Sequence, residues 1–210
     1  MKLSEFNFRD LYRQCVILRG EWVYSGAVKM LADYSYIVPP GLDAALCFCY
    51  IDSEAGMSFH FLCLANFETG EIDEKSYEKI LEEKTLLTFR ANPDFEIKVY
   101  LNDVALFAFR INMVDEIYHN DKRILPTRDI IEIDHLRNNC FPDDIQVLLR
   151  KEGLETEVPW VRLFEIKNRK IYGLLLNEPF ERDFGIHAND RVRVKLGTHE
   201  NKVFAVVDVE

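Results

Sequence analysis

Apolar residues recur at helical spacing near the start of the chain. In residues 8–34 they lie three or four positions apart, and they follow Asn7, a residue type that often caps a helix. The segment "VPPG" ends the pattern at Pro39, because proline cannot continue a helix. The spacing therefore predicts a helical segment from Phe8 to Tyr34.

Two pairs of apolar segments predict β-hairpins in the first half of the chain. The aromatic-rich segments "AALCFCYI" and "MSFHFLCLANF" are separated by "DSEAG", whose glycine suits a hairpin loop. The segments "FEIKVYL" and "VALFAFRI", joined at Asn102-Asp103, predict a second hairpin. Between these pairs, "DEKSYEKILEEKTLL" has its apolar residues at helical spacing and predicts a helix.

The pattern changes towards strands in the second half. In residues 112–142, "TRDIIEIDHL" fits a short helix or a strand, and "NNCFPDD" fits a loop. From Ile145 onward nearly every apolar segment has the pattern of a strand. Because Asn, Pro and Asp cluster at Asn138–Asp144, we expect an α+β N-terminal region over residues 1–140 and a mostly antiparallel β region over residues 145–210.

The segments "VPWVRLFEI" and "KIYGLLLN" predict an antiparallel hairpin with Asn168-Arg169 as its two-residue loop. That register places Glu165 opposite Tyr172, Phe164 opposite Gly173 and Trp160 opposite Asn177. An aromatic ring across the ladder would then cover Gly173. Pro179 ends the strand, since it has no N–H to donate.

A turn at Asn189-Asp190 and the segment "VFAVVDV" complete the predicted sheet. The intervening strand alternates, with three residues expected to face the core (Val192, Val194 and Leu196) and three to face water (Arg191, Arg193 and Lys195). The fold class is therefore α+β, with N-terminal helices and β-hairpins and a C-terminal antiparallel sheet or partly closed barrel.

Charge narrows the classes of partner. The 210 residues carry a net charge of −10, and residues 1–105 hold 10 Lys and Arg against 17 Asp and Glu. Such a surface repels phosphate backbones, so no nucleic-acid partner is expected, while a basic protein partner suits it. The pattern indicates no oligomeric state.

Apolar runs and cysteines bear on the compartment. The start of the chain lacks the pattern of a signal peptide, and no apolar run is long enough to cross a bilayer, so no membrane association is expected. Five scattered cysteines favour reduced thiols over a disulfide framework. We therefore expect a cytoplasmic location.

Two groups of residues have the composition of a metal site. Cys47, Cys49, His60 and Cys63 are of the types that bind zinc, but they lack Cys-x-x-Cys spacing, so buried thiols are the preferred interpretation. The segment "PDFEIKVY" holds Asp94, Glu96 and Lys98, the residue types of a metal-dependent nuclease. The preferred interpretation is the solvated face of a strand, and we expect no metal or other cofactor.

Other catalytic patterns are absent from the sequence. The five histidines (His60, His119, His135, His187 and His199) are dispersed, and no nucleophile elbow, phosphate loop or dinucleotide motif accompanies them. No catalytic residue is assigned, although dispersed residues can assemble in space. The acidic run from Glu68 to Glu83 fits either a docking face for a basic protein or a solvated helix face.

The segments "PWVRLFEIKNRKIYGLLLNEP" and "NDRVRVKL" resemble the core of the bacterial domain-of-unknown-function family numbered twenty-three fourteen. Members share a Trp-Val pair, a short hairpin, a Gly-x-Leu-x-Asn-x-Pro segment and a Gly-Asp-x-Val turn. The matching residues here are Trp160, Val161, Gly173, Leu175, Asn177, Pro179, Asp190 and Val192. Asn189 departs from the pattern at the turn glycine, and "GTHENK" replaces an Asp-Trp-containing end.

The resemblance covers about the last third of the chain and implies no activity. Some relatives occur near bacterial toxin and immunity systems, so it implies an acidic neutralising protein. Our leading hypothesis is thus a non-catalytic protein-binding protein, and the alternatives are an enzyme with a dispersed site and a small-molecule sensor. The motif residues are interpreted as mainly architectural, with four binding candidates: Trp160, Tyr172, Asn177 and Glu178.

Overall fold

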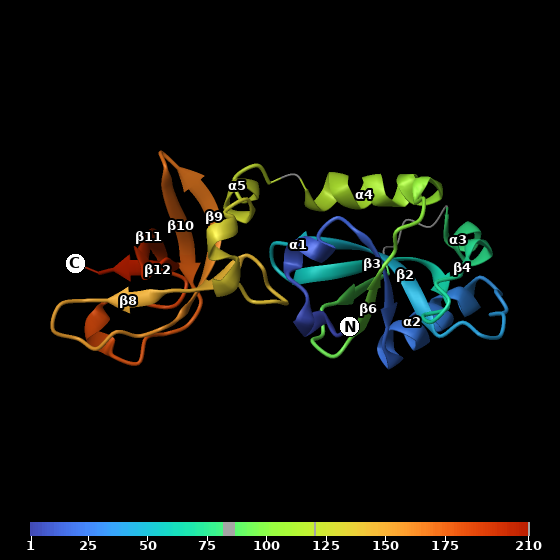
Figure 1. The fold of residues 1–210 in the computed structure, drawn as a ribbon, viewed down its shortest axis with the longest axis horizontal. Coiled ribbons are helices and arrows are strands. Elements are labelled where there is room, and N and C mark those ends of the chain that lie inside the picture. Colours follow the sequence, from blue (N-terminus) through green and yellow to red (C-terminus); the bar gives the residue numbers. More distant parts are fainter. Residues whose placement is uncertain (82–86, 120, 210) are drawn as a thin grey trace. The chain divides into compact units, whose positions relative to one another are not determined.

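A computed structural model describes residues 1–81, 87–119 and 121–209. The chain divides into two compact units, Met1–Asn120 and Asp121–Glu210. Each contains helices and one curled sheet, so the chain has the expected α+β fold (Figure 1). Among the described residues, no helix has the length and apolar character needed to cross a membrane.

The first unit is a sheet with helices packed on it. Its strands are β1 (Cys15–Arg19), β2 (Ala44–Asp52), β3 (Gly56–Ala65), β4 (Ile72–Asp73), β5 (Thr88–Arg90) and β6 (Glu96–Val99). Its helices are α1 (Phe8–Leu11), α2 (Glu21–Asp33), α3 (Glu74–Ile80) and α4 (Ala108–Tyr118), with 3-10 turns η1 (Leu3–Glu5) and η2 (Ala105–Phe107). The strand order is β4-β3-β2-β1-β6, with β5 also on β3, and every pair is antiparallel.

The predicted hairpin of residues 44–67 is confirmed as β2 and β3, whose residues are buried along almost their whole length. Burial of successive residues requires that both faces of the sheet be covered. Figure 1 shows α4 on one side of the sheet and α2 on the other. The predicted helix of residues 73–87 is confirmed over Glu74–Ile80, and residues 82–86 of that prediction lie outside the described residues.

Two predictions for the first unit are only partly right, since α1, α2 and β6 were expected but the connections between them were not. The predicted helix of residues 8–34 is interrupted by β1, in which four successive residues are buried between β2 and β6. A central strand can bury such a run on both faces, whereas a helix at the surface of a sheet cannot. The segment "VALFAFRI" is not a strand but η2 and the start of α4, and the partner of β6 is β1. Phe107, Arg110 and Val114 point inward at helical spacing.

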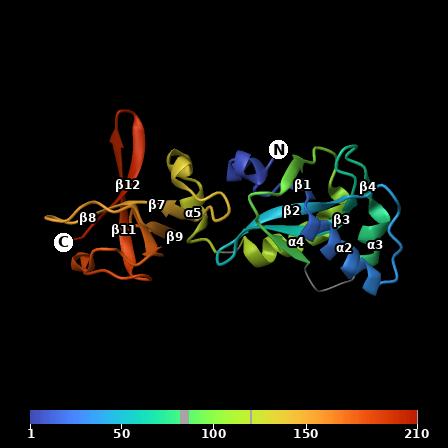
Figure 2. The same cartoon turned by 90° about the horizontal axis from the view of Figure 1, so that it is seen from below.

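The second unit is built on strands from Asp144 onward, one residue before the predicted start at Ile145. These are β7 (Asp144–Gln146), β8 (Leu148–Arg150), β9 (Trp160–Lys167), β10 (Lys170–Leu175), β11 (Arg191–His199) and β12 (Lys202–Asp208). The helical elements are α5 (Leu125–Arg128), η3 (Ile131–Leu136) and η4 (Arg182–Phe184). Figure 2 shows β11 and β12 continuing beyond the sheet as a hairpin.

The sheet of the second unit curls until its two edge strands meet. The order is β7-β9-β10-β11-β12-β8, antiparallel except for the parallel β12–β8 pair. Only Val147 separates β7 from β8 along the chain, so one short segment occupies both edges. A partly closed barrel results, with a core that includes Leu149, Val161, Leu163 and Val192.

The division between the units falls after Asn120, earlier than the predicted boundary at Asn138–Asp144. The segment before the first strand belongs to the second unit because it contributes buried residues to it. Ile133 of η3 lies in that unit's core, and Arg128 of α5 forms a buried ion pair with Asp143.

The β9–β10 hairpin follows the prediction only near its loop. Asn168 and Arg169 have φ values of 52° and 61°, as a two-residue turn requires, and Glu165 lies opposite Tyr172. The register then shifts by a β-bulge, so Gly173 lies opposite Leu163, not Phe164.

Aromatic cover of Gly173 was therefore the wrong explanation. A Cβ atom at Gly173 would lie 2.3 Å from Cγ1 of Val161 and 2.8 Å from the carbonyl oxygen of Arg162. The glycine is needed because backbone and side chain approach closely there. The predicted alternation in β11 holds for Val192 and Val194 but fails at Leu196, which is 40% exposed.

Candidate functional site

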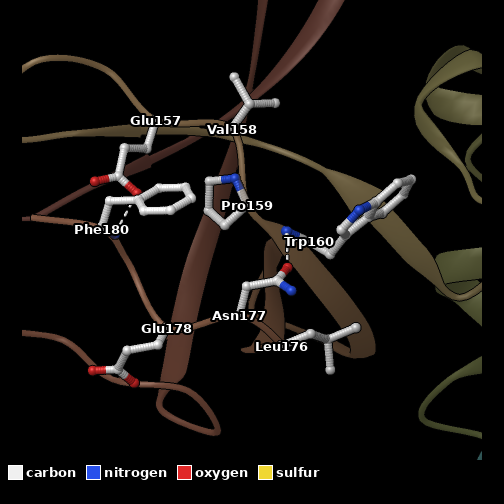
Figure 3. A pocket seen from close by; sticks show the side chains of 8 residues that line it. All are labelled: Glu157, Val158, Pro159, Trp160, Leu176, Asn177, Glu178 and Phe180. Atoms are coloured by element: carbon white, nitrogen blue, oxygen red, sulfur yellow. Dashed lines mark hydrogen bonds between the residues drawn. The ribbon is translucent and has the colours of Figure 1, made fainter.

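A groove of about 710 Å³ opens at the end of the barrel where β9 begins and β10 ends. Two segments line it, 157–160 and 176–180, and Figure 3 shows Asn177 reaching the backbone of Trp160 and Phe180 lying beside Glu157 and Pro159. The lining residues are Glu157, Val158, Pro159, Trp160, Leu176, Asn177, Glu178 and Phe180.

Backbone pairing holds the two segments together. The N–H of Trp160 donates to Oδ1 of Asn177 at 2.9 Å, and the N–H of Leu176 donates to the carbonyl oxygen of Trp160 at 2.8 Å. The Asn177 side chain thus continues the pairing two positions past the end of β10. The predicted placement of Trp160 opposite Asn177 is replaced by this side-chain contact, because the bulge moves Leu176 opposite Trp160.

Two carboxylates fix the loop that follows. Glu157 accepts hydrogen bonds from the N–H groups of Phe180 (3.0 Å) and Glu181 (2.9 Å). Glu178 accepts from the N–H of Ala188 at 2.9 Å, and its other oxygen lies 2.7 Å from Nδ1 of His187. These bonds satisfy backbone donors in a segment that has no sheet partner. The walls of the groove are therefore held in place before any ligand binds.

Apolar side chains at the groove are unusually exposed. Phe180 is 94% exposed and Val158 is 54% exposed, while Trp160 and Leu176 are half-buried. Pro159 is buried beneath them. Exposed apolar surface of this kind, gathered in a concave site, is typical of an interaction surface.

The carboxylate of Glu178 keeps its charge over a wide pH range. The N–H of Ala188 and the ring of His187 lower the pKa of Glu178 below its usual value. In return, the hydrogen bond and charge of Glu178 raise the pKa of His187. The rim of the groove therefore carries the carboxylates of Glu157 and Glu178 next to apolar walls.

Three of the four predicted binding residues lie together in this groove: Trp160, Asn177 and Glu178. Tyr172 lies elsewhere, on the outer face of the sheet, where the guanidinium of Arg191 is 4.3 Å from its ring centroid. The prediction missed Glu157, Val158 and Phe180. The signal for Phe180 is its place directly after Pro179, since an aromatic residue beyond the end of a strand has no sheet to pack on.

The cysteines of the first unit are buried thiols, as preferred from the sequence. Cys47, Cys49 and Cys63 lie within β2 and β3 and form no disulfide. Burial raises the pKa of each thiol. Within residues 1–81, 87–119 and 121–209, no group of three or more His, Cys, Asp or Glu residues is arranged to hold a metal ion.

The nuclease-like residues are engaged in other contacts. Asp94 pairs with Lys2 at 3.0 Å, and Glu96 pairs with Arg19 at 2.5 Å. Lys98 donates to the backbone carbonyl of Glu68. Cationic side chains thus occupy the positions next to both carboxylates.

The acidic run lies partly on α3 and partly in the turns before it. Glu68 pairs with Arg19, and Asp73 accepts a hydrogen bond from the hydroxyl of Tyr36. Glu82 and Glu83 lie outside the described residues. Part of the run therefore has contacts within its own unit.

Asn189 supports the turn before β11. Its φ of 72° is a left-handed conformation that glycine and asparagine tolerate best, so asparagine can serve where the resembled family has glycine.

Comparison of the chain with protein-family models, curated proteins and solved structures finds no match. The resemblance to the family numbered twenty-three fourteen stays a prediction.

Proposed function

We propose that this chain is a non-catalytic, cytosolic protein-binding protein of bacterial toxin-immunity type. The groove between residues 157–160 and 176–180 binds a basic partner protein. The partner packs an apolar side chain on Phe180 and sets a Lys or Arg beside the rim carboxylates.

The exposure of Phe180 is the observation that carries the proposal. A phenylalanine that is 94% exposed gains from burial on binding, and aromatic side chains are frequent hot spots of protein interfaces. Its backbone N–H is tied to Glu157, so little backbone ordering is needed when it is covered. The groove is thus suited to contribute affinity through one central aromatic residue.

Charge supports a basic partner. Glu178, with its lowered pKa, supplies a fixed negative charge at the rim, and the whole chain carries a net charge of −10. A field of this sign accelerates association with a basic protein and disfavours acidic competitors. The five unpaired cysteines support the cytosolic part of the proposal.

The first test is capture with the purified protein as bait, followed by calorimetry with the product of a neighbouring gene. Phe180→Ser removes the aromatic contact, and Ile131→Ser is the matched control because Ile131 is 67% exposed but outside the groove. We expect Phe180→Ser to weaken binding by roughly thirtyfold, the effect of losing a hot-spot side chain of about 2 kcal/mol, and Ile131→Ser to leave it unchanged. Equal binding by both variants would exclude this groove as the docking site.

A second candidate is a small-molecule sensor or an enzyme that uses the same groove. Its volume of about 710 Å³ falls in the range of ligand pockets, and the hydrogen-bonded Glu178–His187 pair beside it has opposite pKa shifts. Thermal-shift measurements over a metabolite panel separate this candidate from the first. A compound that stabilises the wild type but not Asn177→Ala would favour it.

A further inference from the structure

A second groove lies at the opposite end of the β9–β10 hairpin. It has a volume of about 340 Å³, and β10, β11 and the hairpin loop form its walls. Its lining is mainly cationic, in contrast to the groove of Figure 3. The lining residues are Arg169, Lys170, Ile171, Arg193, Val194, Lys195 and Leu196.

Three of these cations are uncompensated. Lys195 pairs with Asp208 at 2.8 Å, but Arg169, Lys170 and Arg193 form no ion pair within the part of the chain that the structure describes. All three side chains are exposed. These three cations thus form a local positive cluster on a chain whose net charge is −10.

The strand register adds a repulsion between like charges near this cationic groove. Lys170 lies directly opposite Lys167 in the β9–β10 ladder, and like charges in that position destabilise a hairpin. The structure therefore contains a local electrostatic cost that an anion would remove. Of the two lysines, Lys170 lines the groove, so an anion bound there would offset their repulsion.

The groove is also rigid and partly apolar. The pairing of Ile171 with Val194 and the turn at Asn168-Arg169 fix the backbone on which the cations stand. Leu196, which the alternation predicted to face the core, is 40% exposed and lines the groove. A ligand with both an anionic and an apolar part could contact all of these groups.

We propose that this groove binds a small molecule carrying two or more adjacent phosphoryl groups. Arg169 and Arg193 can each donate two parallel hydrogen bonds to phosphoryl oxygens, and Lys170 adds a third positive charge. The volume suits a small ligand. A long nucleic acid fits less well, because the acidic remainder of the chain would repel its backbone.

The experiment titrates the full chain with sodium tripolyphosphate at low ionic strength and follows backbone amide shifts and calorimetry. Lys170→Gln/Arg193→Gln removes two of the cations. Lys122→Gln/Lys202→Gln is the matched control, since it removes the same charge from exposed positions of the same unit that do not line the groove. Urea melts establish that both double variants are folded. If the groove variant Lys170→Gln/Arg193→Gln is not folded, the single variant Lys170→Gln takes its place.

We expect amide shifts centred on residues 169–171 and 193–196 and a loss of affinity of about tenfold or more in the groove variant. The control should bind within about twofold of the wild type. The proposal fails if those amides do not shift, or if the control loses as much affinity as the groove variant. It also fails if an oligoglutamate peptide or a single-stranded oligonucleotide binds this groove more tightly than tripolyphosphate does.

Discussion

Arg128 and Asp143 form a two-pronged ion pair in the interior of the second unit. Nε of Arg128 donates to Oδ1 of Asp143 at 2.8 Å, and Nη2 donates to Oδ2 at 2.7 Å. The two side chains are only 3% and 4% exposed. This pair joins α5 to the loop before β7, and it makes the chain after Asn120 part of the barrel unit.

Asp143→Asn should destabilise the protein by about 3–5 kcal/mol, because it leaves the guanidinium of Arg128 buried without its counter-charge. The double variant Arg128→Met/Asp143→Leu should lose less, since it removes both charges from the interior. Urea melts of Arg128→Met, Asp143→Leu and the double variant form the cycle that measures the coupling between the two residues. Additive losses would show that the two residues stabilise the unit independently.

Gly173→Ala should destabilise the second unit by roughly 1–3 kcal/mol, the usual range for overpacking. The new Cβ would collide with Val161 and with the backbone carbonyl of Arg162, which cannot move without breaking the ladder. Gly197→Ala is the matched control. Its Cβ would meet only the ring of Phe204, which is half-buried and can turn aside. Equal losses in thermal melts would mean that the close approach at Gly173 is not what requires glycine.

Burial of His60 should make the protein less stable in mild acid. Burial and the charge of Arg110 lower the pKa of His60 from 6.5 to about 4. Below pH 6.5 the unfolded chain binds a proton that the folded protein binds only near pH 4, so the free energy of unfolding falls as pH drops through this window.

The expected loss over that window is roughly 3 kcal/mol for a shift of this size, and this contribution is flat above pH 6.5. Unfolding by urea at a series of pH values measures it. His60→Gln should reduce the slope, whatever its effect on stability at neutral pH. An unchanged slope would assign the acid sensitivity to other groups.

His187 should titrate above its usual pKa, because Glu178 accepts its hydrogen bond and carries the opposite charge. Stability from the raised pKa of His187 is complete below 6.5 and is lost as pH rises through the folded value. Stability from the lowered pKa of Glu178 is lost as pH falls through its folded value. NMR titration of the imidazole in wild type and Glu178→Gln checks the pairing. The same imidazole pKa in both proteins would contradict it.

Local patterns predicted the elements whose residues alternate or repeat regularly. The turn at Asn168-Arg169 could be placed because the flanking segments alternate and asparagine tolerates positive φ. The strand Cys15–Arg19 could not, since four buried residues in succession suit a helix or a central strand, and only pairing with β2 and β6 decides between them.

The residues that line the groove were predictable only where they belong to a regular local pattern. Trp160, Asn177 and Glu178 stand out in the hairpin motif, and all three line the groove. Glu157 and Phe180 lie in irregular segments, and they come together through hydrogen bonds between residues more than twenty positions apart. A β-bulge at Gly173 shifts the register by one residue, and no local sequence pattern predicts that bulge.

The meeting of both sheet edges at residues 144–150 partly closes the barrel but leaves parts of its strands without a neighbour. Natural sheets must protect such edges, since an unpaired edge invites another chain to add a strand and start an aggregate. In residues 121–209, β7 pairs only with Trp160–Arg162 of β9 and β8 only with Val206–Asp208 of β12, so strand addition stays possible along the rest of both strands. The two proposed binding sites of this unit use side chains instead, namely the aromatic and acidic groups at one end of the β9–β10 hairpin and the cations at the other.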